Sequence, residues 1–498
     1  MTALDIGIAS FPALLVLIFL RVPIGLAMFV VGFVGSWLVT GQIGMGLNRL
    51  KSETFTTFSN YSLSIVPIFL LMGQFATLGG LSTALFKAAE GWLGHRRGGI
   101  AMASVGACAG FGAICGSSLA TAATMGRVAL PQLRKHGYSG GFSSATLAAG
   151  GTLGILIPPS VILVIYAILT EQNIAKLFLA AFVPGLLAAI GYMIAIRIYV
   201  QLNPHSAGTK ARVPYAERLR DLWAVTPVLA IFVVVVGGIY SGLFTPTEGA
   251  SIGALGTAVV AWANGGLTWA TLTDSFQITA KSTAMIFFII LGAAFYNGFL
   301  ALTQLPQELA AWVGAQGFSP WVVLILILVF YLLLGCLMDS LSMILLTIPI
   351  FWPMVQGLDF NLITMADLHA AKAHAALANG VDIAPAMLAD IKAALAQGVE
   401  LTRDQIKALE IRGVSKGALN RAATEQLAIW FGILVLIVVE VGLITPPVGM
   451  NLFVINAMDK TTPMAATYRA VIYFIASDIL RVALLVAFPV ITLVFVGL

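Results

Sequence analysis

Charged residues are scarce in this sequence. Only 9% of its 498 residues are Asp, Glu, Lys or Arg, whereas 59% are hydrophobic, and an average soluble domain carries roughly 25% charged residues. So few polar residues cannot cover the outside of a soluble fold. The composition therefore excludes an ordinary soluble protein and predicts an all-α integral membrane protein with several spanning helices.

Patterns of metal ligands and of nucleotide binding are missing as well. The three cysteines, Cys108, Cys115 and Cys336, lie in apolar stretches without CxxC spacing, and the five histidines show no HExxH spacing. We therefore expect buried thiols rather than disulfides, and no zinc-type site. The absence of a Walker motif argues against a self-contained ATP-driven pump. The net charge of +5 comes without Lys/Arg clusters interleaved with aromatic residues, so we expect no nucleic-acid partner.

One motif resembles that of an enzyme. The stretch from Gly137 to Gly141 matches the GxSxG pattern of serine hydrolases, with Ser139 at the nucleophile position. It follows a basic group rather than a predicted strand, and no histidine or acid accompanies it in a suitable order, so a turn explains it better. We expect the protein not to be an enzyme. An intramembrane serine hydrolase that uses Ser139 is the alternative from another functional class.

The charges that are present mark the two sides of the membrane. The first apolar run, Ile6 to Leu20, has no basic leader before it, and we expect a retained spanning helix. By the positive-inside rule, three basic groups belong to the cytoplasmic side. They are Lys87, Arg96 and Arg97; Arg134 and Lys135; and Arg197, Lys210, Arg212, Arg218 and Arg220.

The apolar stretch 99–131 begins and ends beside such basic groups, so both of its ends should lie on one side of the membrane. At about 20 residues per spanning helix it is too short to cross twice, and a polar sequence, Gly110 to Ser118, interrupts it. We therefore predict a re-entrant hairpin with its tip near Ser117 and Ser118, buried in protein or beside water.

The second half of the chain repeats this pattern. Pro158 and Pro159 interrupt the apolar stretch 142–170, which predicts a broken helix, and a near copy, GLITPP, begins at Gly442, 288 residues after Gly154. A second polar interruption follows the first by 223 residues, counted from Gly116 to Asp339, and no Lys or Arg flanks it. We infer two homologous halves of opposite orientation, as in secondary transporters with a midplane site between the repeats.

The two spacings differ by 65 residues, which is the length of one charged segment, 361–425. This segment holds seven basic and seven acidic residues and has glycines at 380, 398 and 413 that should end helices. It predicts a soluble insertion of two or three short helices. Because the second hairpin is expected to have its ends opposite the cytoplasm, the insertion should face the periplasm.

Polar residues at the predicted tips are the strongest signals of function. Asp339 lies in an apolar run, where a carboxylate is costly unless it is paired or lines a polar cavity, so a cation-linked role and a structural hydrogen bond are its two readings. Hydroxyl groups nearby suit a hard cation such as Na⁺, although small residues also permit close helix packing. These hydroxyls belong to Ser117, Ser118, Thr121, Ser340 and Ser342.

Three other acidic residues lie among apolar neighbours. They are Glu248, Glu440 and Asp478, and we assign none of them a catalytic role. Asp478 stands at helical spacing from Arg481, with which it can pair.

Several long motifs give the chain a family resemblance. In order they are GAICGSSLATAATMGRVALPQLRKHGY, GTLGILIPPSVILVIYAILT, LFTPTEGAS, GCLMDS and EVGLITPPVGMNLF. Together they resemble the large membrane subunit of tripartite ATP-independent periplasmic (TRAP) transporters, over nearly the whole chain outside the insertion, which the family pattern lacks. The resemblance implies an elevator-type secondary transporter in the bacterial inner membrane that imports a small organic acid, such as a dicarboxylate or sialic acid, together with Na⁺. Its implied partners are a periplasmic binding protein and a small membrane subunit; a channel is the alternative within transport.

The same resemblance implies a division into scaffold and transport parts. Residues 1–95 are the first scaffold helices, 96–200 the first transport half, 201–300 a cytoplasmic loop and the second scaffold helices, 301–360 the second hairpin, 361–425 the insertion, and 426–498 a broken helix and the C-terminal transmembrane helix.

Residues at the tips and breaks are the implied site residues. For the cation they are Ser117, Ser118, Gly154, Pro158, Asp339, Ser340, Thr445, Pro446 and Gly449; for the substrate they are Thr121, Ser160, Ser342 and Asn451. Na⁺ is expected as the coupling ion, without an organic cofactor. Nothing in the sequence selects the solute.

Overall fold

The chain folds into helices throughout its described part. The computed structural model describes residues 2–378, 381, 383–411 and 413–496, and these contain no strand. Five segments are long and apolar enough to cross a membrane, or up to seven if each of two bent helix pairs is one span. The predicted all-α membrane fold is therefore confirmed. The five are η1 with α4 (Tyr61–Leu78), α10 (Ile174–Leu202), α14 (Trp269–Thr303), α21 (Lys416–Gly442) and α23 (Met464–Ala487); the bent pairs are α8 with α9 (Gly140–Leu156 and Val161–Thr170, 44°) and α11 with α12 (Tyr215–Trp223 and Thr226–Tyr240, 45°).

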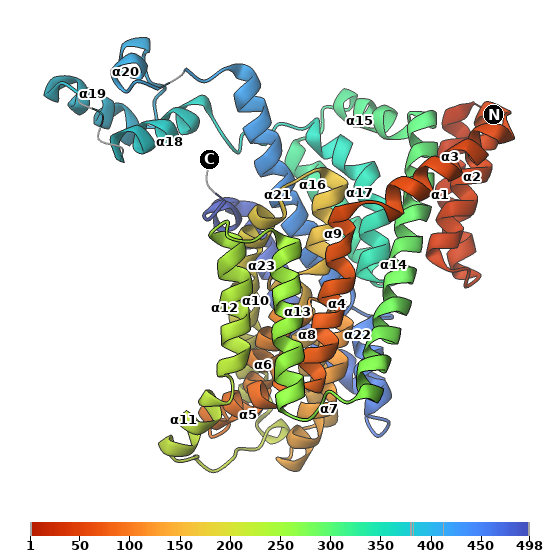
Figure 1. Ribbon diagram of the computed structural model, residues 1–498, viewed down its shortest axis with the longest axis vertical. Coiled ribbons are helices and arrows are strands. Elements are labelled where there is room, and N and C mark those ends of the chain that lie inside the picture. The colour runs from red at the N-terminus through yellow and green to blue at the C-terminus, as the bar shows by residue number, and fades with distance from the viewer. Residues whose placement is uncertain (1, 379–380, 382, 412, 497–498) are drawn as a thin grey trace.

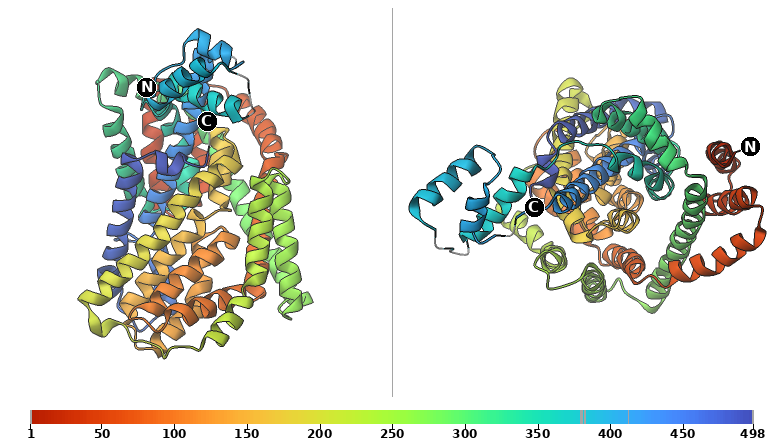
Figure 2. Two further views of the ribbon diagram at one scale, coloured as in Figure 1. Left: turned by 90° about the vertical axis from the view of Figure 1, so that its left-hand side faces the viewer. Right: turned by 90° about the horizontal axis from the view of Figure 1, so that it is seen from above.

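One group of helices forms an arc around the others, which we call the scaffold arc (Figure 2). Along it α12 packs on α13, α13 on α4, α4 on α14, and α14 on α2, and both α1 and α3 pack on α2 at the outer edge. The bounds not yet given are α1 Ala3–Phe19, α2 Ile24–Thr40, α3 Ile43–Phe58, α4 Ile65–Leu78 and α13 Pro246–Ala263.

The helices inside the arc form two matching sets, which we call the core. In the first set α6 and α7 form a hairpin, α8 and α9 a broken helix, and α10 follows; in the second set the same roles fall to α16 and α17, α21 and α22, and α23. α7 packs on α22 and α17 on α9, so each hairpin contacts the broken helix of the other set. The bounds are α6 Gly99–Cys115, α7 Ser118–Lys135, α16 Pro320–Gly335, α17 Ser340–Gln356 and α22 Met450–Met458.

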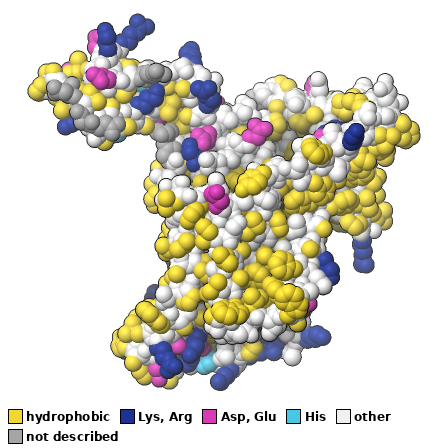
Figure 3. Space-filling model, viewed as in Figure 1, with side chains coloured by type: hydrophobic (Ala, Val, Ile, Leu, Met, Phe, Trp, Pro, Cys, Tyr) yellow, Lys and Arg dark blue, Asp and Glu magenta, His cyan; other side chains and the backbone are white. Residues whose placement is uncertain are grey.

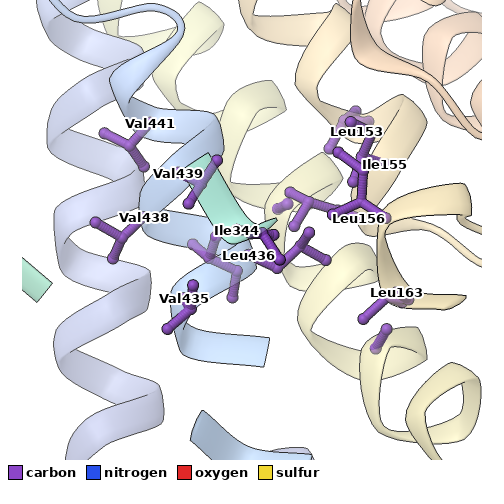
Figure 4. Close-up of a cluster of buried hydrophobic side chains, with 14 of the residues drawn as sticks. Leu153, Ile155, Leu156, Leu163, Ile344, Val435, Leu436, Val438, Val439 and Val441 are labelled. Atoms are coloured by element: carbon purple, nitrogen blue, oxygen red, sulfur yellow. The ribbon is translucent and has the colours of Figure 1, made fainter. Parts of the chain in front are cut away.

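The two equivalent helices α8 and α21 form the centre of the core. Every residue from Gly141 to Leu156, and from Gln426 to Gly442, is buried. A helix that is apolar and buried on all faces is surrounded by protein rather than lipid. In Figure 4, Ile344 of α17 reaches between the side chains of α21 and Leu156 of α8. Since lipid tails are as apolar as these side chains, close packing holds such helices together in a membrane.

Charged segments lie at the two opposite ends of the molecule (Figures 1 and 3). At one end, which we call the basic end, lie α5 (Leu81–Leu93), α11 and the end of α7. Ion pairs of 2.9 Å, Lys87–Asp221 and Lys210–Glu90, hold α5 to α11 and to the loop before it. At the other end project α18 (Met365–Ala378), α19 (Pro385–Ala396) and α20 (Arg403–Ala408), which share a small apolar cluster of their own.

The last ten residues of the predicted insertion, 361–425, are helical and continue into the core. Residues from Lys416 to Glu425 form the first turns of α21, which runs unbroken from the projecting helices into the core. Ser415 begins this helix, because its hydroxyl accepts a hydrogen bond from the Ala418 N–H at 3.2 Å. We call residues 361–415, which precede α21, the projecting segment; within α21 every residue is buried only from Gln426 to Gly442.

Several short helices complete the chain. They are η2 (Pro204–Ser206), α15 (Leu305–Ala315) and α24 (Val490–Leu493). α15 lies against α17. α5, which the sequence analysis grouped with the scaffold, packs on α6, α7 and α11.

Candidate functional site

The first hairpin turns at Gly116 and Ser117. Gly116 has a φ of 64°, in the left-handed region that favours glycine, and this ends α6. Ser117 caps α7, with its hydroxyl accepting from the Ala120 N–H at 3.4 Å. The N-terminus of α7 therefore begins inside the protein, at the tip of the hairpin.

The second hairpin turns at Asp339, which caps α17. Its carboxylate accepts from the Ser342 N–H at 3.1 Å and from the Ser342 hydroxyl at 2.6 Å. The structural hydrogen bond considered for Asp339 is thus present, and the Ser342 hydroxyl donates its proton in it. Asp339 is nevertheless only half-buried, and it also faces a cavity.

The two broken helices have matching breaks. Ser160 caps α9 by accepting from the Leu163 N–H at 3.4 Å, after Pro158 and Pro159. In the second set, α21 ends at Gly442, and α22 starts after Gly449, whose φ is 65°. The Thr445 hydroxyl donates to the Val441 carbonyl at 2.6 Å, one turn back.

Glycine pairs bring each hairpin directly against the broken helix of its own set. A methyl group on Gly112 would lie 2.5 Å from the Cα of Gly154, and one on Gly442 would lie 2.5 Å from the Cα of Gly335. The spacing of 223 relates Gly112 to Gly335, and the spacing of 288 relates Gly154 to Gly442. The same two spacings found in the sequence therefore relate one backbone contact to its equivalent in the other half.

A cavity of about 530 Å³ contains both tips. It lies between the core and the scaffold arc, with α4 and α14 as its outer wall. Four of the predicted site residues line it: Ser117, Ser118, Asp339 and Ser340. Its lining residues on α7 run from Ser118 to Arg127, toward the end of that helix at Lys135, so the cavity extends from the tips toward the basic end.

The other predicted site residues do not line this cavity. Thr121 and Asn451 are fully buried in the core, and the Asn451 amide donates to the Ala148 carbonyl at 3.3 Å. The Thr121 hydroxyl and the Asn451 Oδ1 have no hydrogen-bond partner within the described residues. The remaining residues lie in or beside the two breaks: Gly154, Pro158, Ser160, Thr445, Pro446 and Gly449, with Ser342 in the first turn of α17.

Glu440 lies beside the tips but was not among the predicted site residues. It is buried in α21, and its Oε1 accepts from the Ser340 hydroxyl at 2.8 Å. The Ser118 hydroxyl faces the same carboxylate, whose Oε2 is buried and has no hydrogen-bond partner among the described residues. The Glu440 carboxylate therefore lies beside both hairpin tips. Its signals in the sequence are its apolar neighbours and its place five residues before the Thr-Pro-Pro break.

A second polar group lies deeper in the core. Asp478 accepts from Arg481 at 2.8 Å, which confirms the predicted pairing, and from the Tyr192 hydroxyl at 2.8 Å. Tyr192 in turn contacts the Thr152 hydroxyl at 2.9 Å. The spacing of 288 relates Thr152 to Glu440, so the two halves differ here, with a hydroxyl in one and a carboxylate in the other.

The enzyme-like motif has no catalytic surroundings. Ser139 is exposed at the start of α8, and its N–H donates to the Ser206 carbonyl at 3.0 Å. The described residues that line the cavity beside it include neither a histidine nor an acid. The three cysteines are buried and free, as expected.

The family model of the tripartite ATP-independent periplasmic transporter, DctM component, matches residues 11–491. The chain belongs to this TRAP transporter family. The C4-dicarboxylate TRAP transporter large permease protein DctM of Pseudomonas aeruginosa is 33% identical over 85% of this chain and 83% of its own length. The ectoine/5-hydroxyectoine TRAP transporter large permease protein UehC of Ruegeria pomeroyi is 30% identical over 75% of this chain and 87% of its own.

The fold of this TRAP permease also resembles a solved structure. The YdaH transporter of Alcanivorax borkumensis has a TM-score of 0.58 and 14% identity, and the match covers 93% of this chain and 91% of that one. The fold is thus that of a membrane transporter. TRAP large permeases are transporters and not enzymes, which removes the hydrolase alternative built on Ser139.

Proposed function

We propose that this TRAP permease imports a small organic acid together with Na⁺, by an elevator movement of the core against the scaffold arc. The observation that carries the proposal is the meeting of both hairpin tips in one cavity at the boundary between core and arc. Binding at this boundary allows a solute to travel with one body past the other, which a fixed channel does not require.

The groups around the tips suit Na⁺. Hard cations prefer oxygen ligands, and the tips present the hydroxyls of Ser117 and Ser340 and the carboxylate of Asp339. Glu440 adds a buried carboxylate oxygen without a hydrogen-bond partner among the described residues. Within that same part of the chain, no group of three or more His, Cys, Asp or Glu residues could hold a metal ion. This donor set favours a hard monovalent ion held by hydroxyl and carboxylate oxygens.

The same tips suit an anion once the cation is bound. α7 and α17 begin at Ser118 and Ser340, and the free N–H groups of a helix start carry partial positive charge. Asp339 and Glu440 oppose an anion by their negative charge. Na⁺ beside them would reduce this repulsion, which gives a physical reason for coupling between ion and solute.

The elevator part of the proposal rests on how the two bodies touch. The core meets the arc chiefly where α4 packs on α6 and where α14 packs on α17, so the helices in contact carry or adjoin the tips. We propose that the basic end is cytoplasmic and that 361–415 faces the periplasm of a bacterial inner membrane. A periplasmic binding protein would deliver the solute, and a small membrane subunit would join the scaffold.

Asp339→Asn tests the coupling. In proteoliposomes supplied with the partner binding protein and its solute, we expect uptake by the variant to lose most of its dependence on Na⁺. A control variant, Asp404→Asn, changes an exposed acid on the projecting segment. Unchanged Na⁺-dependent uptake by Asp339→Asn would show that Asp339 serves only as a helix cap.

A cysteine at Ala394 tests the orientation. An impermeant thiol reagent should label Ala394→Cys in intact spheroplasts, because α19 projects away from the basic end. Labelling only after the membrane is opened would reverse the proposed topology.

A further inference from the structure

Arg127 lies in the cavity that holds the two tips. It is on α7, and it lines the cavity together with Ala120, Ala123 and Thr124. These spacings of three and four residues place all four side chains on one face of the helix. Arg127 is exposed on this face.

Arg127 has no protein partner among the described residues, whether in a hydrogen bond or in an ion pair. Three other basic side chains near this end are paired: Arg134 with Asp459, Lys87 with Asp221, and Lys210 with Glu90. Arg127 stands nine residues after Ser118 and eight before Lys135, or about 14 Å and 12 Å along the helix. An unpaired guanidinium at such a depth is costly, and it marks a functional site by default.

The direction of the side chain and its neighbours point to a ligand. Side chains on a helix lean toward its N-terminus, which for α7 is the tip. The same cavity is lined by polar side chains that make no side-chain hydrogen bond in the described structure: Gln74, Thr124 and Ser282. Arg127 is the only positively charged residue among those lining the cavity, and Asp339 is the only negatively charged one.

We propose that Arg127 binds the carboxylate of the solute on the basic side of the tips. A guanidinium matches a carboxylate in planar geometry and can hold it by two parallel hydrogen bonds. The two ligands would then bind at different places along the cavity. The cation ligands lie at the tips, and Arg127, which receives the anion, lies about two and a half helical turns farther along α7. This inference rests on the proposed function, and it assigns one anionic group of the solute to one residue.

Rates of cysteine modification test the charge of Arg127 without any knowledge of the solute. Thr124→Cys, in a chain with Cys115→Ala, places a reporter thiol in the cavity; Cys108 and Cys336 are buried. The probes are the anionic reagent MTSES and the cationic reagent MTSET, applied to the purified full chain in proteoliposomes. A unit charge about 6 Å away in water changes each rate about threefold, in opposite directions. Adding Arg127→Gln should therefore lower the MTSES/MTSET rate ratio about tenfold.

Matched variants separate charge from shape. Arg127→Lys should keep most of the ratio, because it keeps the positive charge. Arg220→Gln, which removes an exposed arginine of α11 outside the cavity, should leave the ratio unchanged. An unchanged ratio in Arg127→Gln would overturn the proposal. If that variant also lost copurifying anionic lipid, Arg127 would belong to the bilayer surface instead.

Uptake distinguishes this inference from the proposed function. Na⁺-dependent uptake of the solute carried by the binding protein should show a KM at least tenfold higher in Arg127→Gln, with partial recovery in Arg127→Lys. Equal KM values in the variant and the parent chain would refute the role of Arg127. If the parent chain itself showed no Na⁺-dependent uptake, the proposed function would fail, whereas the rate ratio would still report on Arg127.

Discussion

At the residue scale, Glu440 combines an acidic side chain with burial in the core. Its carboxylate is buried, with one oxygen bonded to Ser340 and the other without a hydrogen-bond partner among the described residues. Glu440→Gln keeps an acceptor for Ser340 and removes the negative charge. We expect the Na⁺ concentration for half-maximal uptake to rise at least tenfold. The measurement is uptake at varied Na⁺, with exposed Glu400→Gln as control; unchanged Na⁺ dependence would place Glu440 outside the cation site.

Asp459 gives a pH-dependent contact at the basic end. It accepts from the hydroxyls of Thr461 and Thr462 at 2.8 and 2.7 Å and pairs with Arg134. Burial by itself would raise its pKa, but the two hydroxyls and the guanidinium outweigh burial and hold the pKa below the usual 3.8. A carboxyl with a lowered pKa stabilises the fold above its usual pKa, and this contribution is lost as the pH falls through the folded-state value.

Asp459→Asn should therefore destabilise the protein at neutral pH but not in acid. Loss of the charge-assisted hydrogen bonds should cost about 1–3 kcal/mol at pH 7. The difference in unfolding temperature from the parent chain should shrink as the pH falls below about 4. Thermal unfolding of the purified protein across this pH range checks it. A difference that stays constant with pH would mean that the carboxylate charge is not what stabilises the contact.

At the element scale, the glycine pairs fix how closely hairpins and broken helices approach. Gly112→Ala would place a methyl group 2.5 Å from the Cα of Gly154, and such overpacking costs about 1–3 kcal/mol. Gly237→Ala on α12 is the control, because nothing lies within 4 Å of the added atom; it should be neutral or stabilising by up to about 1 kcal/mol. Thermal unfolding of both variants measures this. If Gly112→Ala were as stable as Gly237→Ala, the hairpin could move away from the broken helix without a loss of stability.

Breaks in the helices were the part of the fold that the sequence could predict. Glycine and paired prolines have local backbone consequences, so the tips at Ser117 and Asp339 and the break before Ser160 were visible in the residues themselves. The start of α21 at Lys416 was not, because Lys416 to Glu425 favours a helix whether it lies in water or continues a buried span.

Contacts across the core could not be predicted in the same way. Glu440 reaches Ser340 only because α21 packs beside α16 and α17, which no local pattern reveals. Thr121, Ser160, Ser342 and Asn451 are polar and adjoin the tips or breaks, yet packing turns them away from the cavity. Arg127 was not singled out from the sequence, because only the structure places it on the face of α7 that lines the cavity.

At the scale of the whole molecule, the proposed elevator movement predicts that a bond between core and arc stops transport. A Cβ built on Gly73 of α4 lies 3.3 Å from the Sγ of Cys115 at the first tip, within reach of a disulfide. Oxidised Gly73→Cys should lose at least nine-tenths of its uptake and regain it on reduction.

The native cysteine supplies the control for this cross-link. Gly73→Cys combined with Cys115→Ala cannot form the bond, so its uptake should not respond to oxidant. Full uptake by a chain whose cross-link is confirmed by mass spectrometry would exclude sliding of the first tip past α4.

The unbroken course of α21 has a mechanical consequence. Its 27 residues form a rod of about 40 Å that begins beside the projecting segment and ends beside the tips. The other attachment of that segment is α17, so both of its anchors belong to the core. In the proposed elevator movement, the projecting helices would therefore move together with the core, outside the bilayer. One spin label on α19 and one on the scaffold helix α13 would report the proposed movement as a change in the distance between the two labels. Neither label would lie in the cavity that holds the tips.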